Sequence, residues 1–132
     1  PEEFQRWVIE PSSKICRELR RRYPDIKIIG FPKGVGVGYV DYVKKVDIDA
    51  VAIDTSVSPA WAAEYLQNEV TVQGNLDPIA LIQGGSQMIE QARNIRKNLQ
   101  NGPFIFNLGH GVLPSTPVEN LIKLAKYLKT SP

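Results

Sequence analysis

Hydrophobic positions along the chain alternate between stretches with helical spacing and short runs rich in β-branched residues. This alternation is typical of βα units, in which each strand of a parallel sheet is followed by a helix that packs on it. Strands are expected at residues 26–31, 50–54, 70–73 and 104–108. One helix is expected before the first strand and another after each strand. The pattern therefore predicts an α/β fold built on a parallel sheet.

The leading helical stretch covers residues 4–22 and ends in basic residues. Pro11 must begin a new helix or kink an existing one, because proline has no amide hydrogen to donate. Cys16 lies in helical register with apolar neighbours and is expected to be a packed or edge thiol. The residues expected to share the inner face of this stretch are Phe4, Trp7, Val8, Ile15 and Leu19.

Two later helices have recognisable start signals. Ser58 followed by Pro59 is typical of an N-cap residue and a proline at the first helical position. Thr116 and Glu119 have the spacing of a capping box in front of the last helix, with Pro117 between them. The helical residues expected to face the core are Tyr39, Val40, Val43, Trp61, Ala62, Tyr65, Met88, Ile89, Ala92, Ile95, Leu99, Val118, Leu121, Ile122, Ala125 and Leu128.

The composition is that of one ordinary globular domain. The chain has 132 residues, of which 42% are hydrophobic and 23% charged. A formal net charge of +2 provides no strong overall field that would attract nucleic acid or an anionic membrane. We interpret Arg20, Arg21 and Arg22 as a solvated helix end, where cations complement the helix dipole. Cys16 is the only cysteine, so neither an internal disulfide nor a multi-thiolate metal site is expected, which is typical of a reducing compartment.

The start of the sequence bears on how much of a protein it represents. The chain begins with Pro1 and its only methionine is Met88. We interpret residue 1 as a processed start or a position inside a longer polypeptide. The sequence has no signal-peptide pattern and no apolar run near the roughly 18 residues that a membrane helix needs. A soluble single unit over residues 1–132 is therefore expected, with no nucleic-acid or membrane partner.

Polar side chains collect where the predicted strands end. In parallel α/β folds, ligands bind outside the carboxyl ends of the strands, so these residues are expected to share one mouth. The alternative is that they serve only turns and helix caps. The residues are Lys33, Asp54, Thr55, Gln73, Asn75, Asp77, Asn107 and His110.

His110 and a glycine-rich loop are the sharpest local features. His110 is the only histidine, and the glycines on both sides of it allow a ligand to approach the backbone closely. Gly34, Gly36 and Gly38 could surround an anion with amide groups. However, Tyr39 occupies the position of the third glycine in the dinucleotide motif, so nucleotide binding is not favoured. The sequence shows no metal-ligand spacing and no nucleophile elbow.

Several stretches are distinctive beyond their local chemistry. The sequence from Phe106 to Gly111 reads FNLGHG, and residues 73–78 read Gln-Gly-Asn-Leu-Asp-Pro. The distinctive stretches, in order along the chain, are 30–34, 53–55, 70–78, 106–111, 113–114 and 116–120. In this order they resemble the uroporphyrinogen decarboxylase family, and residues 106–120 are similar to its closing segment.

The resemblance implies a fold and an activity. The fold is a (β/α)₈ TIM barrel, of which this chain would supply the carboxy-terminal half: four strands with their helices and a leading helix. The enzyme would be a cytoplasmic homodimer of haem and tetrapyrrole (porphyrin) biosynthesis. It would decarboxylate the four acetate side chains of uroporphyrinogen III to give coproporphyrinogen III, without any cofactor.

The resemblance also assigns roles to particular residues. The family's central aspartate, arginine clamps, tyrosine and serine lie in the amino-terminal part of the barrel, so the isolated chain is predicted to be catalytically inactive. His110 is the one functional residue that carries over, and it would hydrogen-bond a substrate carboxylate or assist a proton transfer. The residues expected to shape the barrel mouth are Asp54, Gln73, Asn75, Asp77 and Asn107.

Two alternatives remain open. Related corrinoid-dependent methyltransferases bind zinc through a His-x-Cys pair, but Gly111 and Val112 follow His110 here, so no metal site is expected. The second alternative is a self-sufficient α/β module that binds an anionic ligand at its glycine loop. If the chain is half of a barrel, its open strand edges are expected to pair with another copy or a neighbouring fragment, or the ends reorganise.

Overall fold

The computed structural model of the chain describes residues 2–130. Four parallel strands form one sheet in the order β1-β2-β3-β4, which confirms the predicted α/β class. The strands are β1 (Ile29–Gly30), β2 (Ala50–Ala52), β3 (Thr71–Leu76) and β4 (Phe104–Leu108). The helices are α1 (Glu2–Phe4), the π-helical turn η1 (Gln5–Ile9), α2 (Glu10–Arg22), α3 (Gly38–Lys45), α4 (Pro59–Tyr65), α5 (Pro78–Gln83), α6 (Gly85–Leu99) and α7 (Val118–Thr130).

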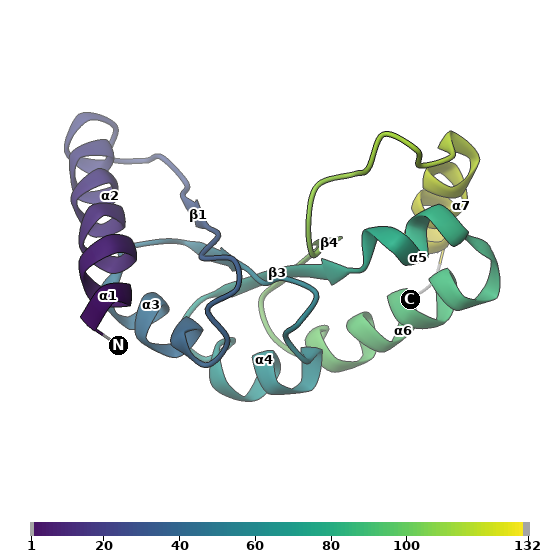
Figure 1. The fold of residues 1–132 in the computed structure, drawn as a ribbon, viewed down its shortest axis with the longest axis horizontal. Coiled ribbons are helices and arrows are strands. Elements are labelled where there is room, and N and C mark those ends of the chain that lie inside the picture. Colours follow the sequence, from purple (N-terminus) through teal and green to yellow (C-terminus); the bar gives the residue numbers. More distant parts are fainter. Residues whose placement is uncertain (1, 131–132) are drawn as a thin grey trace.

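The sheet is open, and its helices cover one face. Figure 1 shows α2 at one end of the sheet and α7 at the other, with α3, α4 and α6 along one side between them. Successive side chains of a strand point to opposite faces, so only alternate residues reach this helical layer. Val51, Ile53 and Val72 are fully buried, whereas Ile29 and Ile105 are exposed. The core therefore lies between the sheet and one helical layer.

Three of the four strands differ in their bounds from the predicted ones. β1 is shorter than predicted, and the amide of Ile28 donates to Asp49 Oδ2 (2.9 Å). β2 ends before Asp54, whose amide donates to the Tyr39 hydroxyl (3.2 Å). β3 extends to Leu76 because residues 74–76 continue to pair with residues 106–108. The predicted bounds of β4 are confirmed.

The leading helix is continuous through Pro11, and its predicted inner face is only partly correct: Phe4 and Val8 pack against the core as predicted. Trp7 and Ile15 are 63% and 60% exposed, whereas Ile9 and Cys16 are buried. The helix widens into a π turn just before the proline, where the amide of Glu10 donates to the carbonyl of Gln5. A π turn has more residues per turn than an α-helix, so it shifts the helical phase, and one regular α-helical spacing does not predict the buried face on both sides of it.

The predicted core positions are confirmed more fully in α6 than in α7. Met88, Ala92, Ile95 and Leu99 are buried as predicted. In α7, however, Val118 and Ile122 are 62% and 50% exposed, and Ala125 is also exposed. The buried residues of α7 are instead Asn120 and Leu124. A helix at the end of an open sheet has a neighbour on one side only, so one apolar stripe stays uncovered.

The predicted caps are also only partly present. Ser58 occupies the N-cap of α4, but its side chain makes no capping hydrogen bond. Thr116 Oγ1 is buried without a partner, so the expected capping box before α7 is not formed. Asp77 does cap α5, because its Oδ1 accepts from the Ile79 amide (2.8 Å). Within α4, Ala62 is buried as predicted, whereas Tyr65 is exposed.

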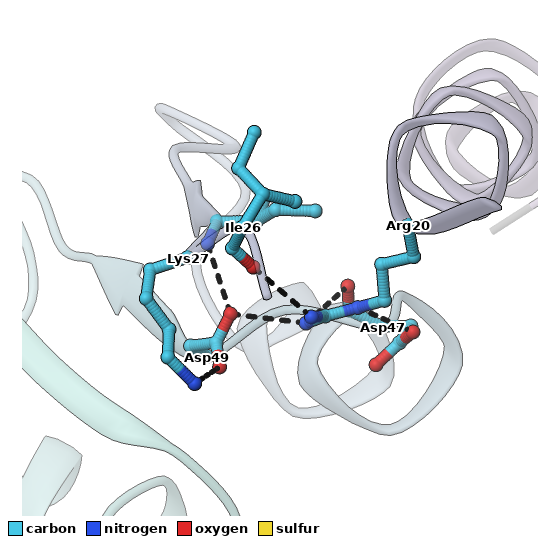
Figure 2. Close-up of polar contacts among 6 residues, drawn as sticks. Arg20, Ile26, Lys27, Asp47 and Asp49 are labelled. Atoms are coloured by element: carbon cyan, nitrogen blue, oxygen red, sulfur yellow. Dashed lines mark hydrogen bonds and ion pairs between the residues drawn. The ribbon is translucent and has the colours of Figure 1, made fainter. Parts of the chain in front are cut away.

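An ionic cluster joins α2 to the segments that precede β1 and β2 (Figure 2). Arg20 lies 2.6 Å from Asp47 and 3.0 Å from Asp49, and Lys27 lies 3.1 Å from the other oxygen of Asp49. Asp49 also accepts from the Ile28 amide. The Ile28 hydrogen bond, with those of Lys27 and Arg20, lowers the pKa of Asp49 from 3.8 to about 2. The cluster fixes the amino-terminal ends of the strands, opposite the ends where site residues were expected.

We expect Asp49→Asn to remove a step in the pH dependence of stability. Because the folded pKa lies below the ordinary value, the carboxylate contributes fully above pH 3.8, and this contribution is lost as the pH falls towards 2. Urea unfolding at several pH values between 5 and 2 measures the effect. The free energy of unfolding of the variant should fall less over this range than that of the original chain. Asp25→Asn, which removes one exposed carboxylate outside the cluster, is the matched control for the loss of a negative charge.

Candidate functional site at the carboxyl ends of the strands

Asp54 is the centre of the hydrogen-bond network at the carboxyl ends of the strands. Its side chain is buried directly after β2, at 4% exposure. Oδ2 accepts from the Gly34 amide (2.8 Å) and the Tyr39 hydroxyl (3.1 Å). Oδ1 accepts from the amide and the hydroxyl of Ser56, at 2.9 and 2.5 Å. One carboxylate thus joins the loop after β1, the start of α3 and the loop after β2.

The environment of Asp54 favours its ionised form. Burial alone would raise the pKa of Asp54, but the hydrogen bonds from Ser56, Gly34 and Tyr39 outweigh it and hold the pKa below its ordinary value. Burial also raises the pKa of the Tyr39 hydroxyl, which lies beside this carboxylate. Asp54 is therefore an anion that accepts hydrogen bonds and Tyr39 is a neutral donor, so neither group is suited to exchange a proton near neutral pH.

Asn75 extends the network to β3. Its Nδ2 donates to the carbonyls of Asp54 and Val57, both at 2.8 Å. The side chain is buried, and its Oδ1 has no hydrogen-bond partner. Asn75 pairs in register with Asn107 of β4. The amide side chain therefore connects the ends of β2 and β3 and lies beside the last strand.

The glycine before His110 brings the fourth strand into the same cluster. A Cβ atom on Gly109 would lie 2.7 Å from Thr55 Cγ2 and 2.8 Å from the Thr55 amide nitrogen. The Gly109 amide donates to the carbonyl of Leu76 (2.8 Å). The absence of a side chain thus allows the loop after β4 to pack directly on the loop after β2. The backbone next to His110 is fixed by this contact.

His110 itself is exposed, and its ring orientation is defined by its neighbour. Nδ1 accepts from the amide of Gly111 (2.7 Å). In a neutral imidazole one nitrogen accepts and the other donates, so the ring proton is on Nε2. Nε2 is therefore the atom that can donate to a ligand at this end of the sheet.

The other predicted mouth residues have more local roles. Gln73 is half-buried inside β3, paired with Ala52 and Ile105, rather than at a strand end as predicted. Asp77 caps α5. Asn107 is exposed in β4, and its Oδ1 accepts from the Leu108 amide. Lys33 and Thr55 are exposed in loops after β1 and β2. The residues brought together are thus those around Asp54, Asn75 and Gly109.

A polar cleft of about 680 Å³ opens beside this cluster. It is bounded by the loop after β2, the end of β3 and α6. Its lining residues include Thr55, Asn75 and Asp77 from the strand ends and Glu90 and Asn94 from α6. His110 is not among them. The cleft therefore lies towards the helical layer and is separate from the surface that bears the histidine.

Two groups that the alternative functions would use, the Gly34 amide and the Cys16 thiol, already have other surroundings in the structure. The Gly34 amide already donates to Asp54, so it cannot also bind an anion. Cys16 is buried in the core, and burial raises the pKa of its thiol. Within residues 2–130, no group of three or more His, Cys, Asp or Glu side chains could hold a metal ion. No helix in this part of the chain is long and apolar enough to cross a membrane.

Two members of the network were missed by sequence reasoning. Tyr39 was expected only as a packing residue, yet its hydroxyl bonds both the side chain and the amide of Asp54. Ser56 was not singled out, although an Asp two residues before a Ser is typical of an Asx turn, in which the aspartate accepts from the later amide. That turn was the available signal. Tyr39 gave no comparable local signal.

Comparison with known proteins places these features in a family. Residues 1–131 match the family model described as uroporphyrinogen decarboxylase (URO-D). A uroporphyrinogen decarboxylase of Rhodospirillum rubrum is 49% identical over 127 residues, which are 96% of this chain and 36% of that protein. Proteins of the same name from Jannaschia sp. and Novosphingobium aromaticivorans are 46% and 40% identical, over 91% and 98% of this chain and 35% and 38% of their own lengths.

The chain spans a little over a third of the length of these relatives, although its four strands are half of those in an eight-stranded barrel. The match nevertheless extends over nearly all of this chain. The chain belongs to the uroporphyrinogen decarboxylase family.

Proposed function

We propose that the chain forms the carboxy-terminal part of the active-site mouth of a uroporphyrinogen decarboxylase. The single observation that carries the proposal is the family match over residues 1–131. The joining of the strand ends through Asp54, Asn75 and Gly109 supports it, because barrel enzymes bind their substrates at that end. The complete enzyme would convert uroporphyrinogen III to coproporphyrinogen III in porphyrin biosynthesis, as a cytoplasmic homodimer.

In the proposed chemistry, this chain and the rest of the barrel supply different groups to the reaction. Protonation of a pyrrole ring next to an acetate group makes the ring an electron sink, so the carbon–carbon bond to the carboxylate breaks and carbon dioxide leaves. The remaining methylene is then protonated to a methyl group, and the ring releases the proton that it first accepted, so one proton is consumed for each carbon dioxide that leaves. The acid and base and the cationic carboxylate clamps that these steps need would come from the part of the relatives that this chain does not span.

His110 is the residue of this chain that we assign to the substrate. Its Nε2–H would donate to a substrate carboxylate, because Nδ1 is already occupied by the Gly111 amide. Asp54 and Asn75 would act as positioning residues, since both oxygens of the Asp54 carboxylate and the Nδ2 of Asn75 are occupied by hydrogen bonds within the protein. Gln73, Asp77 and Asn107 would shape the barrel mouth and its helix starts.

A chimeric enzyme tests this function. The chimera is the Rhodospirillum rubrum relative with its matched segment replaced by this chain. It should form coproporphyrinogen, whereas the isolated chain should form none. His110→Ala in the chimera should raise KM about tenfold, because one hydrogen bond to a charged group is lost, while kcat changes less than about threefold. Steady-state kinetics under anaerobic conditions would measure both constants.

The His110→Asn variant is the matched control for this experiment. It keeps an amide donor and should recover part of the lost affinity. A fall in kcat without a change in KM would instead assign His110 to a proton transfer. Coproporphyrinogen formation by the isolated chain, or a folded chimera with no activity, would refute the proposed function.

A further inference from the structure

A cleft of about 580 Å³ lies between α6 and α7, two helices that contact each other within this chain. Its lining includes Ser86, Ile89, Glu90 and Arg93 of α6 and Lys123 of α7. Neither His110 nor any member of the network around Asp54 lines it, and it shares only Glu90 with the polar cleft beside Asn75. The cleft between α6 and α7 is therefore separate from the candidate site at the strand ends.

Two cations face this cleft without a carboxylate partner. Arg93 comes from α6 and Lys123 from α7. Within residues 2–130 neither side chain forms an ion pair, although Glu90 lies one helical turn before Arg93. Among the described residues that line the cleft, Glu90 is the one carboxylate. The cleft therefore has an excess of positive charge, which favours an anion.

The donors in the lining suit a group with three acceptor oxygens. A guanidinium donates to two oxygens of one anion, and an ammonium can donate to a third. The Ser86 hydroxyl is a further donor beside them. α6 begins at this cleft, and Gly84 at its N-cap has no side chain that could accept from the first amides of the helix. A carboxylate offers two oxygens to these donors and a phosphate group offers three, so the donor set favours phosphate.

The cleft also has an apolar wall and more room than one phosphate group needs. Met88 and Ile89 line it, the first fully buried and the second partly buried against the core. Its volume lies within the range of pockets that hold small organic ligands, about 300–1,000 Å³. An apolar wall beside cationic groups suits a ligand with an anionic group at one end and an organic group at the other.

We propose that the cleft between α6 and α7 binds a small phosphate monoester. Its phosphate oxygens accept hydrogen bonds from Arg93 and Lys123, and its organic group contacts Ile89. The site goes beyond the proposed function, because the decarboxylation of a tetrapyrrole neither uses nor releases phosphate. None of the residues that we assign to the tetrapyrrole lines this cleft.

An NMR titration of the chain at constant ionic strength tests the site, with phenyl phosphate, inorganic phosphate and benzoate as probes. Phenyl phosphate should shift the amide signals of Ser86 and Ile89 in a saturable way, with a Kd of about 1 mM or below. Inorganic phosphate lacks the organic group, and benzoate has fewer oxygens and less charge, so each should bind about fivefold more weakly. Shifts that do not saturate, or an affinity for either control equal to that for phenyl phosphate, would overturn the proposal.

Three exposed cations provide matched variants for the titration. Arg93→Ala and Lys123→Ala should each weaken the binding of phenyl phosphate about tenfold, because each removes a charged donor. Lys126→Ala removes an exposed cation of α7 that does not line the cleft, so it should leave the affinity unchanged. If Lys126→Ala weakened binding as much as Lys123→Ala, a diffuse attraction to basic helices would explain the result and the proposed site would be wrong.

Glu90→Gln has the opposite expected effect. It should tighten the binding of phenyl phosphate about threefold, because the carboxylate that opposes the anion becomes neutral while the side chain keeps its shape. An unchanged or lower affinity would contradict the placement of the anion in this cleft.

The titration is independent of decarboxylation. An active chimera together with a chain that binds no phenyl phosphate would refute this site and leave the proposed function in place. An inactive chimera together with saturable binding that depends on Arg93 and Lys123 would do the reverse.

Discussion

Replacing Asp54 by alanine is expected to lower the free energy of unfolding by roughly 3 kcal/mol, because several donors lose their acceptor at once in a buried position. The amides of Gly34 and Ser56 and the hydroxyl of Tyr39 all donate to this carboxylate. No other side chain in the network can take over all three. Chemical denaturation of the variant and the original chain would measure the difference.

Two further variants show whether the loss comes from the network. Asp54→Asn keeps the shape and one acceptor oxygen, so we expect an intermediate loss. Asp77→Ala removes a carboxylate that accepts one hydrogen bond at the start of α5 and should cost only about 1 kcal/mol. If Asp54→Ala and Asp77→Ala destabilised the chain equally, the central role of Asp54 would be wrong.

Gly109→Ala is expected to destabilise the chain by roughly 2 kcal/mol, because the added methyl group would overlap the loop after β2. Its Cβ would lie 2.7 and 2.8 Å from atoms of Thr55, and one of these atoms is a backbone nitrogen that cannot rotate away. The loop after β4 would have to move, and His110 would move with it. In the chimera, the variant should therefore also raise KM for uroporphyrinogen.

Gly111→Ala is the matched control on the other side of His110. A Cβ atom there would meet nothing within 4 Å, so we expect almost no change in stability. Thermal unfolding of both variants, together with KM in the chimera, would compare the two glycines. A Gly111 variant as unstable as the Gly109 variant would show that loop flexibility, and not close packing, explains the need for glycine.

Much of the fold follows from local sequence signals. The short apolar run at residues 104–108 predicts β4 correctly because both of its ends are marked by turn residues. The apolar spacing of α6 predicts its buried face because this helix packs on neighbours that are all present. Asp54 and Asn75 were expected near one another because the carboxyl ends of parallel strands lie at the same edge of a sheet.

Other features depend on residues distant in the sequence. The bond between Tyr39 and Asp54 joins the start of a helix to the end of a strand, and no spacing rule links the two positions. The contact of Gly109 with Thr55 requires β4 to pair with β3 in the register that brings the loop after β4 onto the loop after β2. Gln73 was assigned to a strand end because the glycine after it suggested a turn, whereas pairing with β4 carries the strand onward.

The sequence by itself determined the order of strands and helices, the parallel sheet and the polar residues that follow its strands, because periodicity and turn residues act over short distances. Tertiary structure alone decided which faces are covered. Trp7 and Val118 lie on apolar stripes that would be buried beside a neighbouring helix, yet both are exposed at the ends of an open sheet. A hydrophobic pattern specifies that a face can be buried, but burial also requires a neighbour to pack against it.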